Sequence, residues 1–211
     1  MLEEFRKAAT IGLKPTESGG FRGYAVAFLN IDRQGHMVLP GAFAKAIPRY
    51  LEEGGHILVD HDNRAESVIA KAIDAFEDRR GMLVEGVFSG DDRAQAIRKK
   101  ASEGVVDKMS AYFFGKATRF NESQIKSIWN NYGYVPSARQ IELSKRGAGV
   151  ITEVDRIAEV SIVGVPANPE AGIVAVKSDG IHEETTIVVA PRIDLAALAQ
   201  RAALADRILG R

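Results

Sequence analysis

Seven short apolar segments with strand character follow one another along the chain, and their order relative to the helical segments is the strongest constraint on the fold. The strand-like segments are residues 21–32, 56–60, 67–76, 81–88, 107–115, 150–166 and 173–177. Three segments have helical character, namely 39–55, 89–104 and 193–211. Strands and helices do not alternate in a regular βαβ order, so a doubly wound parallel sheet is disfavoured. The sequence predicts an α+β fold, with a mainly antiparallel β-barrel or sheet core and a few surrounding helices.

Local signals set the expected ends of several elements. Residues 67–76 and 81–88 are joined by the turn EDRRG and are expected to pair as two strands. In the segment 89–104, Ser89 or Asp91 is a candidate cap, and Gly104 is expected to end the helix. In the segment 39–55, Pro48 is expected to kink a helix that ends at Gly54 and Gly55.

Two regions stand apart from this core. Residues 119–149 form a polar insertion whose Gly, Asn and Pro content predicts a partly mobile loop with a short helix. The composition changes from Ser178 onward, where a linker leads to an alanine-rich amphipathic helix. We therefore divide the chain into a main domain, residues 1–177 with the insertion, and a C-terminal linker and helix, residues 178–211.

The composition excludes several classes of function. Lys plus Arg and Asp plus Glu both number 28, and the resulting zero net charge disfavours strong nucleic-acid binding. No apolar run approaches the roughly 18 residues needed to cross a membrane, and the first ten residues lack the apolar region of a signal peptide. The chain contains no cysteine, which excludes disulfides, zinc–thiolate sites and a cysteine nucleophile. These features favour a cytosolic protein.

Ser110 and His61 are the candidate catalytic pair. Ser110 interrupts the apolar strand DKMSAYFFG, where it is either a core serine bonded to the backbone or a nucleophile. A serine nucleophile needs a base, and the chain has four histidines. Among them, His61 follows directly on the short strand HILVD and enters a polar loop, a usual position for a functional side chain; it can also be a solvated loop residue.

The strand at 150–166 carries candidate orienting acids. Glu153, Asp155, Glu159 and Ser161 would share one side of this strand if its pairing were regular, although solvent-facing acids are common on edge strands. After the strand, the backbone N–H groups near Ala167 and Asn168 could form an oxyanion hole, or the segment could simply be a turn.

A metal site is the alternative for the histidines. His56, Asp60, His61 and Asp62 lie close together in sequence, and His with carboxylate suits zinc or manganese. On a strand, however, His56 and His61 would point to opposite faces, and the HExxH spacing is absent. No phosphate-binding glycine motif and no GxSxG motif occurs in the sequence.

The order of five motifs resembles the prohead maturation proteases of tailed bacteriophages, serine proteases related in fold to the herpesvirus assemblins. The motifs are FRGYAVAFLNIDRQGHMVLPGAF, HILVDHD, IAKAIDAFEDRRGMLVEGVF, DKMSAYFF and IAEVSIVGVPANPEAGIVAVK. By this resemblance, Ser110 is the nucleophile, His61 the general base and Glu159 the third member, with Asp155 as its competitor and Ala167 and Asn168 near the oxyanion. The resemblance implies no metal and no cofactor.

The resemblance also implies a biological role. The enzyme would cleave scaffold protein, major capsid protein or both inside the immature capsid, in the host cytoplasm, and would process its own tail. A homo-oligomer is left open, and the C-terminal helix would either dock on scaffold or capsid protein or pack on its own domain. The alternatives are a catalytically silent scaffold or capsid-assembly protein with the same fold, and a metal-dependent hydrolase.

Overall fold

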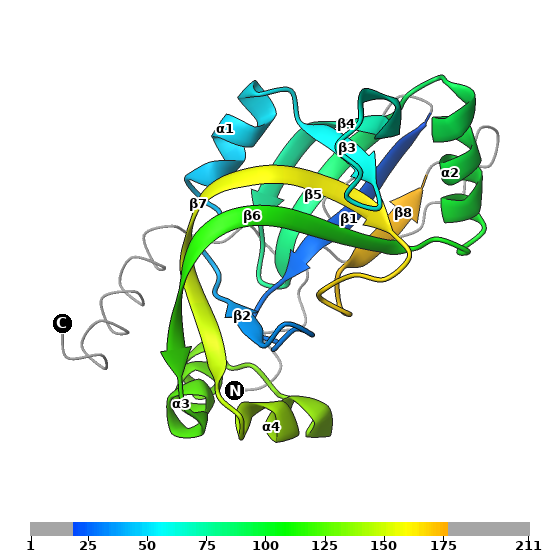
Figure 1. The fold of residues 1–211 in the computed structure, drawn as a ribbon. Helices are drawn as coiled ribbons and strands as arrows, with labels where there is room; N and C mark the ends of the chain where they lie inside the picture. Colours follow the sequence, from blue (N-terminus) through cyan, green and yellow to red (C-terminus); the bar gives the residue numbers. More distant parts are fainter. Residues whose placement is uncertain (1–18, 177–211) are drawn as a thin grey trace, which may run out of the picture.

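A computed structural model of the protein describes residues 19–176, which form one eight-stranded sheet and four α-helices (Figure 1). The strands are β1 (Gly20–Ala27), β2 (His36–Val38), β3 (His56–Val59), β4 (Val68–Glu77), β5 (Gly81–Phe88), β6 (Lys108–Phe120), β7 (Ala148–Val163) and β8 (Gly172–Val176). The helices are α1 (Ala46–Glu52), α2 (Asp92–Ser102), α3 (Glu122–Tyr132) and α4 (Ala138–Ser144), with a 3₁₀ turn, η2 (Ala65–Ser67). The predicted α+β class is confirmed.

The sheet is mixed but mainly antiparallel. Its strand order is β2-β7-β3-β4-β5-β1-β8, and β6 pairs with β7. Only the pairings of β2 and β3 with β7 are parallel among those of the described strands. The pairing does not close into a barrel within residues 19–176, so of the two expected forms of the core the sheet is observed and the barrel is not.

β7 organises the sheet because it pairs with three other strands. β6 follows β7 antiparallel along nearly its whole length, whereas β2 and β3 pair with opposite ends of β7, at 149–151 and 160–162. The β6–β7 register shifts three times, between Tyr112 and Phe113, between Phe114 and Gly115, and between Gly115 and Ala117. Such bulges bend a strand and increase its twist, and both strands curve strongly in Figure 1.

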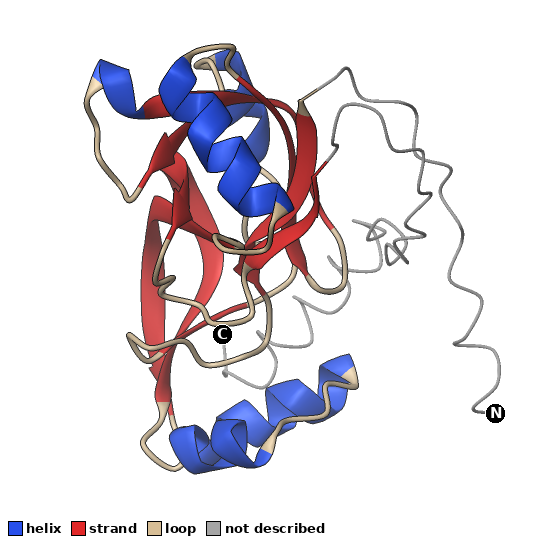
Figure 2. Ribbon diagram, turned by 90° about the vertical axis from the view of Figure 1, so that its right-hand side faces the viewer, coloured by secondary structure: helices blue, strands red, loops and turns tan. Residues whose placement is uncertain are grey.

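The helices lie around the edges and ends of the sheet. α1 contacts β7 and β4, and α2 contacts β4, β5 and β8. Figures 1 and 2 place α3 and α4 together at one end of the molecule, next to the end of β6. No helix of the described part is long and apolar enough to cross a membrane.

The region 119–149 differs from its prediction, because two helices take the place of the expected loop with one short helix. α3 begins with a capping box at Asn121 and ends at Gly133, whose φ of 64° is left-handed. Trp129 is buried, and its indole N–H donates to the Leu29 carbonyl at 2.7 Å. Gln140 of α4 binds both the N–H and the carbonyl of Ile31. The insertion is thus joined to the segment that follows β1.

The predicted ends of α1 and α2 can be compared with the structure. In α2, Asp91 is the cap and accepts from the Ala94 N–H at 3.0 Å, and the turn at Gly104 follows the helix as expected. The helix expected over 39–55 is wrong in length, because only Ala46–Glu52 is α-helical. Pro48 therefore lies in the first turn, where its missing N–H costs no helical hydrogen bond, so the reason for expecting a kink does not apply.

The core lies between the curved sheet and the helices. Its largest fully buried side chains are Trp129, Phe21, Phe43, Met37, Ile57, Ile69, Met82, Leu83, Met109, Ile125, Ile157 and Ile162. They come from the strands, from α3 and from the turn before α1, so the core unites the sheet with the insertion. The predicted C-terminal helix and the boundary at 177/178 lie outside the described residues.

Candidate functional site

The candidate residues converge where β3, β7 and β6 lie side by side. Leu58 of β3 is opposite Ser161 of β7, and Ser161 is opposite Ser110 of β6. Directly opposite residues of an antiparallel pair point to the same face, so the side chains of Ser110 and Ser161 share one face. Glu159 lies two residues before Ser161 and shares that face too.

The chain leaves β3 through an unusual backbone turn that brings His61 to this face. Asp60 and His61 have φ values of 51° and 59°, a left-handed conformation that few non-glycine residues adopt. Three hydrogen bonds hold the turn on the end of β7: Asp60 N–H to the Ile162 carbonyl at 3.0 Å, His61 N–H to Ser161 Oγ at 3.2 Å, and Gly164 N–H to Asp60 Oδ1 at 3.1 Å. Such backbone strain often occurs at functional sites.

A hydrogen-bonded chain links His61, Glu159 and Ser161. His61 Nδ1 is bonded to Glu159 Oε1, and the Ser161 hydroxyl donates to Glu159 Oε2 at 2.5 Å. The Glu159 side chain is 5% exposed, whereas that of His61 is 43% exposed. The buried carboxylate is therefore fixed from two sides, and the imidazole that it holds is accessible from solvent.

The carboxylate also changes the proton affinity of His61. The hydrogen bond that His61 donates to Glu159 is the main cause that raises the pKa of His61; burial lowers this pKa, and the charges of Glu159 and Asp60 raise it further. Because Nδ1 is engaged with the carboxylate, neutral His61 carries its proton on Nδ1 and keeps Nε2 as an acceptor. This is the tautomer that a general base for a hydroxyl requires.

Ser110 lies next to this chain, on the neighbouring strand. The residue is 5% exposed, and its cross-strand partner is Ser161, whose own hydroxyl binds Glu159 and the His61 backbone. Ser110 and the loop that carries His61 thus lie on opposite edges of β7, and the role of Ser110 as the nucleophile of acyl transfer stays a prediction.

The other predicted residues lie differently. Asp155 is exposed, whereas Glu159 is buried, because the register shifts in β7 interrupt the alternation on which a common face depended. Glu159, and not Asp155, is the acid bonded to His61. The Ala167 carbonyl accepts from the Arg33 N–H at 3.1 Å, and the Asn168 amide binds Asn30 and the Ala27 carbonyl. These contacts fix the turn after β7; an oxyanion role for its N–H groups stays a prediction.

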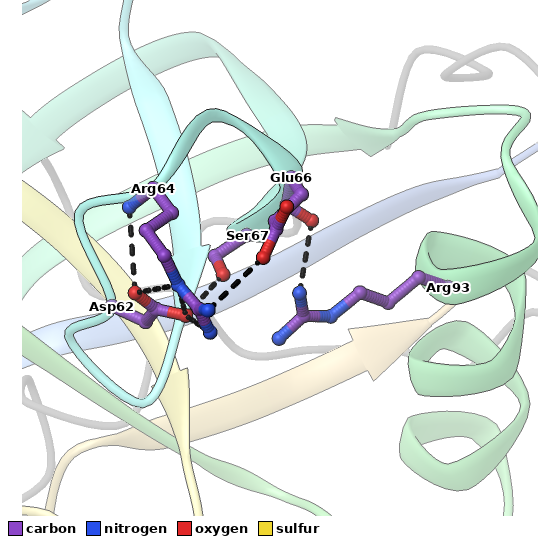
Figure 3. Close-up of polar contacts among 5 residues, drawn as sticks. All are labelled: Asp62, Arg64, Glu66, Ser67 and Arg93. Atoms are coloured by element: carbon purple, nitrogen blue, oxygen red, sulfur yellow. Dashed lines mark hydrogen bonds and ion pairs between the residues drawn. The ribbon is translucent and has the colours of Figure 1, made fainter.

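The loop after His61 is held by a polar cluster (Figure 3). Asp62 accepts from the Arg64 guanidinium at 2.6 Å and from the Ser67 hydroxyl at 2.5 Å, and these two bonds hold the pKa of its carboxyl well below the ordinary range. Arg64 also pairs with Glu66 at 3.1 Å, and Arg93 of α2 donates to the Glu66 carbonyl at 3.0 Å. The cluster connects the loop that carries His61 to α2.

Sequence reasoning missed two contributors to this arrangement. The sequence suggests Asp60 only as a metal ligand, but in the structure its carboxylate accepts from the Gly164 N–H, and its left-handed backbone places His61. The available signal was an Asp at a strand end, since Asp tolerates left-handed turns. The sequence places Ser161 on the same side of the strand as Glu159, but it does not indicate that the Ser161 hydroxyl binds both Glu159 and the His61 N–H. Within residues 19–176, no three His, Asp or Glu side chains gather as metal ligands would.

The chain matches one protein family and is similar to two phage proteins. A family model described as caudovirus prohead serine protease matches residues 8–185. The prohead protease of Enterobacteria phage HK97 is 29% identical over 168 residues, which cover 79% of this chain and 64% of that protein. The chain thus spans less than two thirds of the length of this curated relative. A solved structure of the bacteriophage T4 capsid assembly protease matches with a TM-score of 0.49 and 14% identity, covering 74% of this chain and 87% of the other.

Proposed function

The chain belongs to the caudovirus prohead serine protease family, and from this premise we propose that it is a serine endopeptidase that cleaves capsid proteins during head maturation. The single observation that supports this most is the chain of hydrogen bonds from Ser161 through Glu159 to His61, with Ser110 opposite Ser161 on the neighbouring strand. It contains the residue types of a nucleophile, a base and an orienting acid within three neighbouring strands.

In the proposed reaction, His61 Nε2 takes the proton of the Ser110 hydroxyl as Oγ attacks the peptide carbonyl. Glu159 keeps the proton on Nδ1 and stabilises the imidazolium that forms. His61 then gives its proton to the leaving amine, and an acyl-enzyme on Ser110 remains. Water, activated by the same imidazole, hydrolyses this ester and restores Ser110.

The family premise also supports a substrate class and a place of action. We propose that the substrates are the major capsid protein, the scaffold protein or both, cleaved inside the procapsid in the host cytoplasm, and that the enzyme processes its own chain. An assemblin-like relation of the fold, a protease domain of residues 1–177 with a separate tail, and a homo-oligomer belong to the same proposal. Neither a metal nor a cofactor takes part in it.

The test is co-expression of the full chain with the cognate major capsid protein, read by intact mass. The wild type is expected to shorten the capsid protein, and Ser110→Ala is not. Ser144→Ala is the matched control, because Ser144 is a buried serine in α4 whose hydroxyl binds the Ile141 carbonyl. Cleavage by Ser110→Ala would refute the assignment of the nucleophile. Loss of cleavage in the presence of a chelator would instead favour a metal-dependent hydrolase.

If neither the wild type nor Ser110→Ala shortens the capsid protein while both are folded, the chain has the fold without the activity. That outcome would favour the catalytically silent assembly protein.

A further inference from the structure

Two aromatic side chains on β6 are unusually exposed. Tyr112 is 53% exposed and Phe114 is 49% exposed, and their rings contact each other edge to face with centroids 5.3 Å apart. Phe113, between them, points the other way and packs against Phe43 with ring centroids 5.0 Å apart. The strand therefore directs one aromatic residue into the core and leaves an adjacent pair on the surface. We refer to Tyr112 and Phe114 as the aromatic pair.

The aromatic pair lies on the same face of the sheet as Ser110. Side chains at every second position of a strand share a face, so Ser110, Tyr112 and Phe114 form one row. The pairing with β7 agrees, because Ser110 is opposite Ser161 and Tyr112 is opposite Glu159. With a rise of about 3.4 Å per residue, the two rings start about 7 and about 14 Å along the strand from Ser110.

The residues opposite the aromatic pair on β7 do not cover it with apolar surface. Tyr112 is opposite Glu159, which is buried and bonded to His61, and Phe114 is opposite Arg156, which lies 3.6 Å from Glu53. Two half-exposed rings in contact are a concentrated apolar surface, of the kind that marks binding sites. Aromatic side chains are also the residues that most often dominate binding energy.

The position of the aromatic pair next to Ser110 indicates a polypeptide ligand. A peptide bond that reacts with Ser110 requires an extended polypeptide across this face, and such a chain also advances by about 3.3 Å per residue. In the described part of the chain, β6 forms a ladder with β7 only, although β1 and β8 contact it and the Asp107 carbonyl, just before the strand, accepts from the Ile173 N–H of β8 at 2.8 Å. A substrate strand would therefore add to the other edge of β6 beyond this contact, alongside Tyr112 and Phe114. A side chain two to four residues from the scissile bond would then lie over the aromatic pair.

We propose that the aromatic pair is a specificity subsite that binds an apolar side chain of the polypeptide substrate, two to four residues from the bond that is cleaved. This inference rests on the proposed protease function. The subsite contributes to substrate binding and takes no part in proton transfer.

The test begins with the bond that wild-type full chain cleaves in the cognate capsid protein, located by intact mass. A synthetic peptide of about twelve residues spanning that bond is then the probe, and kcat and KM are measured for it. Tyr112→Ser and Phe114→Ser are each expected to raise KM about tenfold, a loss typical of an aromatic contact, and to change kcat less than about twofold. Tyr112→Phe keeps the ring and is expected to keep the wild-type KM.

Ile73→Ser is the matched control, because Ile73 is also 53% exposed on a strand, in β4. Its KM is expected to equal that of the wild type. In addition, replacing one apolar residue of the peptide, two to four positions from the cleaved bond, with Ala should raise KM for the wild type but not for Phe114→Ser or Tyr112→Ser. This loss of coupling identifies the side chain that the aromatic pair binds.

The outcomes separate the two proposals. Cleavage by the wild type with unchanged KM in both serine variants overturns the subsite and leaves the protease function intact. A lower kcat at unchanged KM overturns it as well. An oligomer that dissociates in Tyr112→Ser while KM stays constant assigns the aromatic pair to a contact between copies of the chain. Failure of the wild type to cleave overturns the protease function and the subsite together.

Discussion

Replacing Ser161 with alanine should lower both the stability and the turnover of the protein, because this one hydroxyl binds both Glu159 and the backbone of His61. Ser161 is fully buried, donates to Glu159 Oε2 at 2.5 Å and accepts from the His61 N–H at 3.2 Å. Removal of this hydroxyl leaves one buried oxygen of Glu159 without its donor. It also removes one of the three hydrogen bonds that hold the left-handed turn at Asp60 and His61 on β7.

The magnitude follows from the two bonds. A hydrogen bond to a charged group contributes about 1.5–3 kcal/mol, and the longer bond to the His61 N–H adds less than about 1 kcal/mol. We expect the free energy of unfolding to fall by about 2–3 kcal/mol, from a total that for most domains is about 5–15 kcal/mol. The variant should therefore fold. Because a small displacement of a catalytic base is costly, kcat should fall about 10- to 100-fold while KM changes little.

The assay is urea unfolding followed by the fluorescence of Trp129, the only tryptophan of the sequence, together with steady-state cleavage of the capsid peptide. Ser144→Ala, which removes a buried hydroxyl from α4, should cost about 1 kcal/mol and leave kcat unchanged. If Ser161→Ala loses no more stability than Ser144→Ala and keeps the wild-type kcat, Ser161 does not position the site.

Two further predictions concern titrating groups. A histidine acts as a base only when it is neutral, and Glu159 raises the pKa of His61, so Glu159→Gln should move the acid limb of the kcat/KM profile to lower pH. The kcat of Glu159→Gln should remain about 10- to 100-fold higher than the kcat of His61→Ala. Equal losses of kcat in the two variants would contradict this order. Burial raises the pKa of Glu77, which accepts from the Phe43 N–H, to about 7. Because the unfolded state releases this proton near pH 4.5 and the folded state releases it only near pH 7, the free energy of unfolding falls as the pH rises from 4.5 to 7. Glu77→Gln should be about 1–3 kcal/mol more stable than the wild type at pH 8 and much less so at pH 5 in urea unfolding, with the exposed Glu52→Gln as control; an equal gain at both pH values would refute this.

The elements that the sequence predicted well are those whose signals are local. The pair β4–β5, joined by its turn, and α2, with Asp91 before it and Gly104 after it, depend on residues within a few positions of each other. The extent of α1 could not be obtained in this way. The apolar spacing of 39–55 suits a helix throughout, but the turn before Ala46 instead binds β7 through the Leu39 N–H and the Ala42 carbonyl. Such tertiary contacts override local propensity.

The same distinction applies to the site. Position alone leaves His61 as either a functional residue or a solvated loop residue, because a polar loop after a short apolar strand suits both, and the resemblance to the prohead proteases is what favours the base. The choice between Glu159 and Asp155 required the bulges of β6 and β7, which decide the face that each acid occupies. A register shift depends on pairing between residues far apart in the sequence, and a regular alternation drawn on one strand cannot reveal it. The link through Ser161 also spans 100 residues from His61.

The central position of β7 has a consequence for when the site can exist. β3 and β6, with His61 and Ser110, are made first, but neither strand pairs with the other; both are placed by β7, whose residues up to Val163 come late in the chain. A nascent chain that ends before Glu159 therefore holds the proposed base and the proposed nucleophile without the acid or the strand that places both of them. From the proposed mechanism we therefore expect no proteolysis by a nascent chain in which β7 is still incomplete.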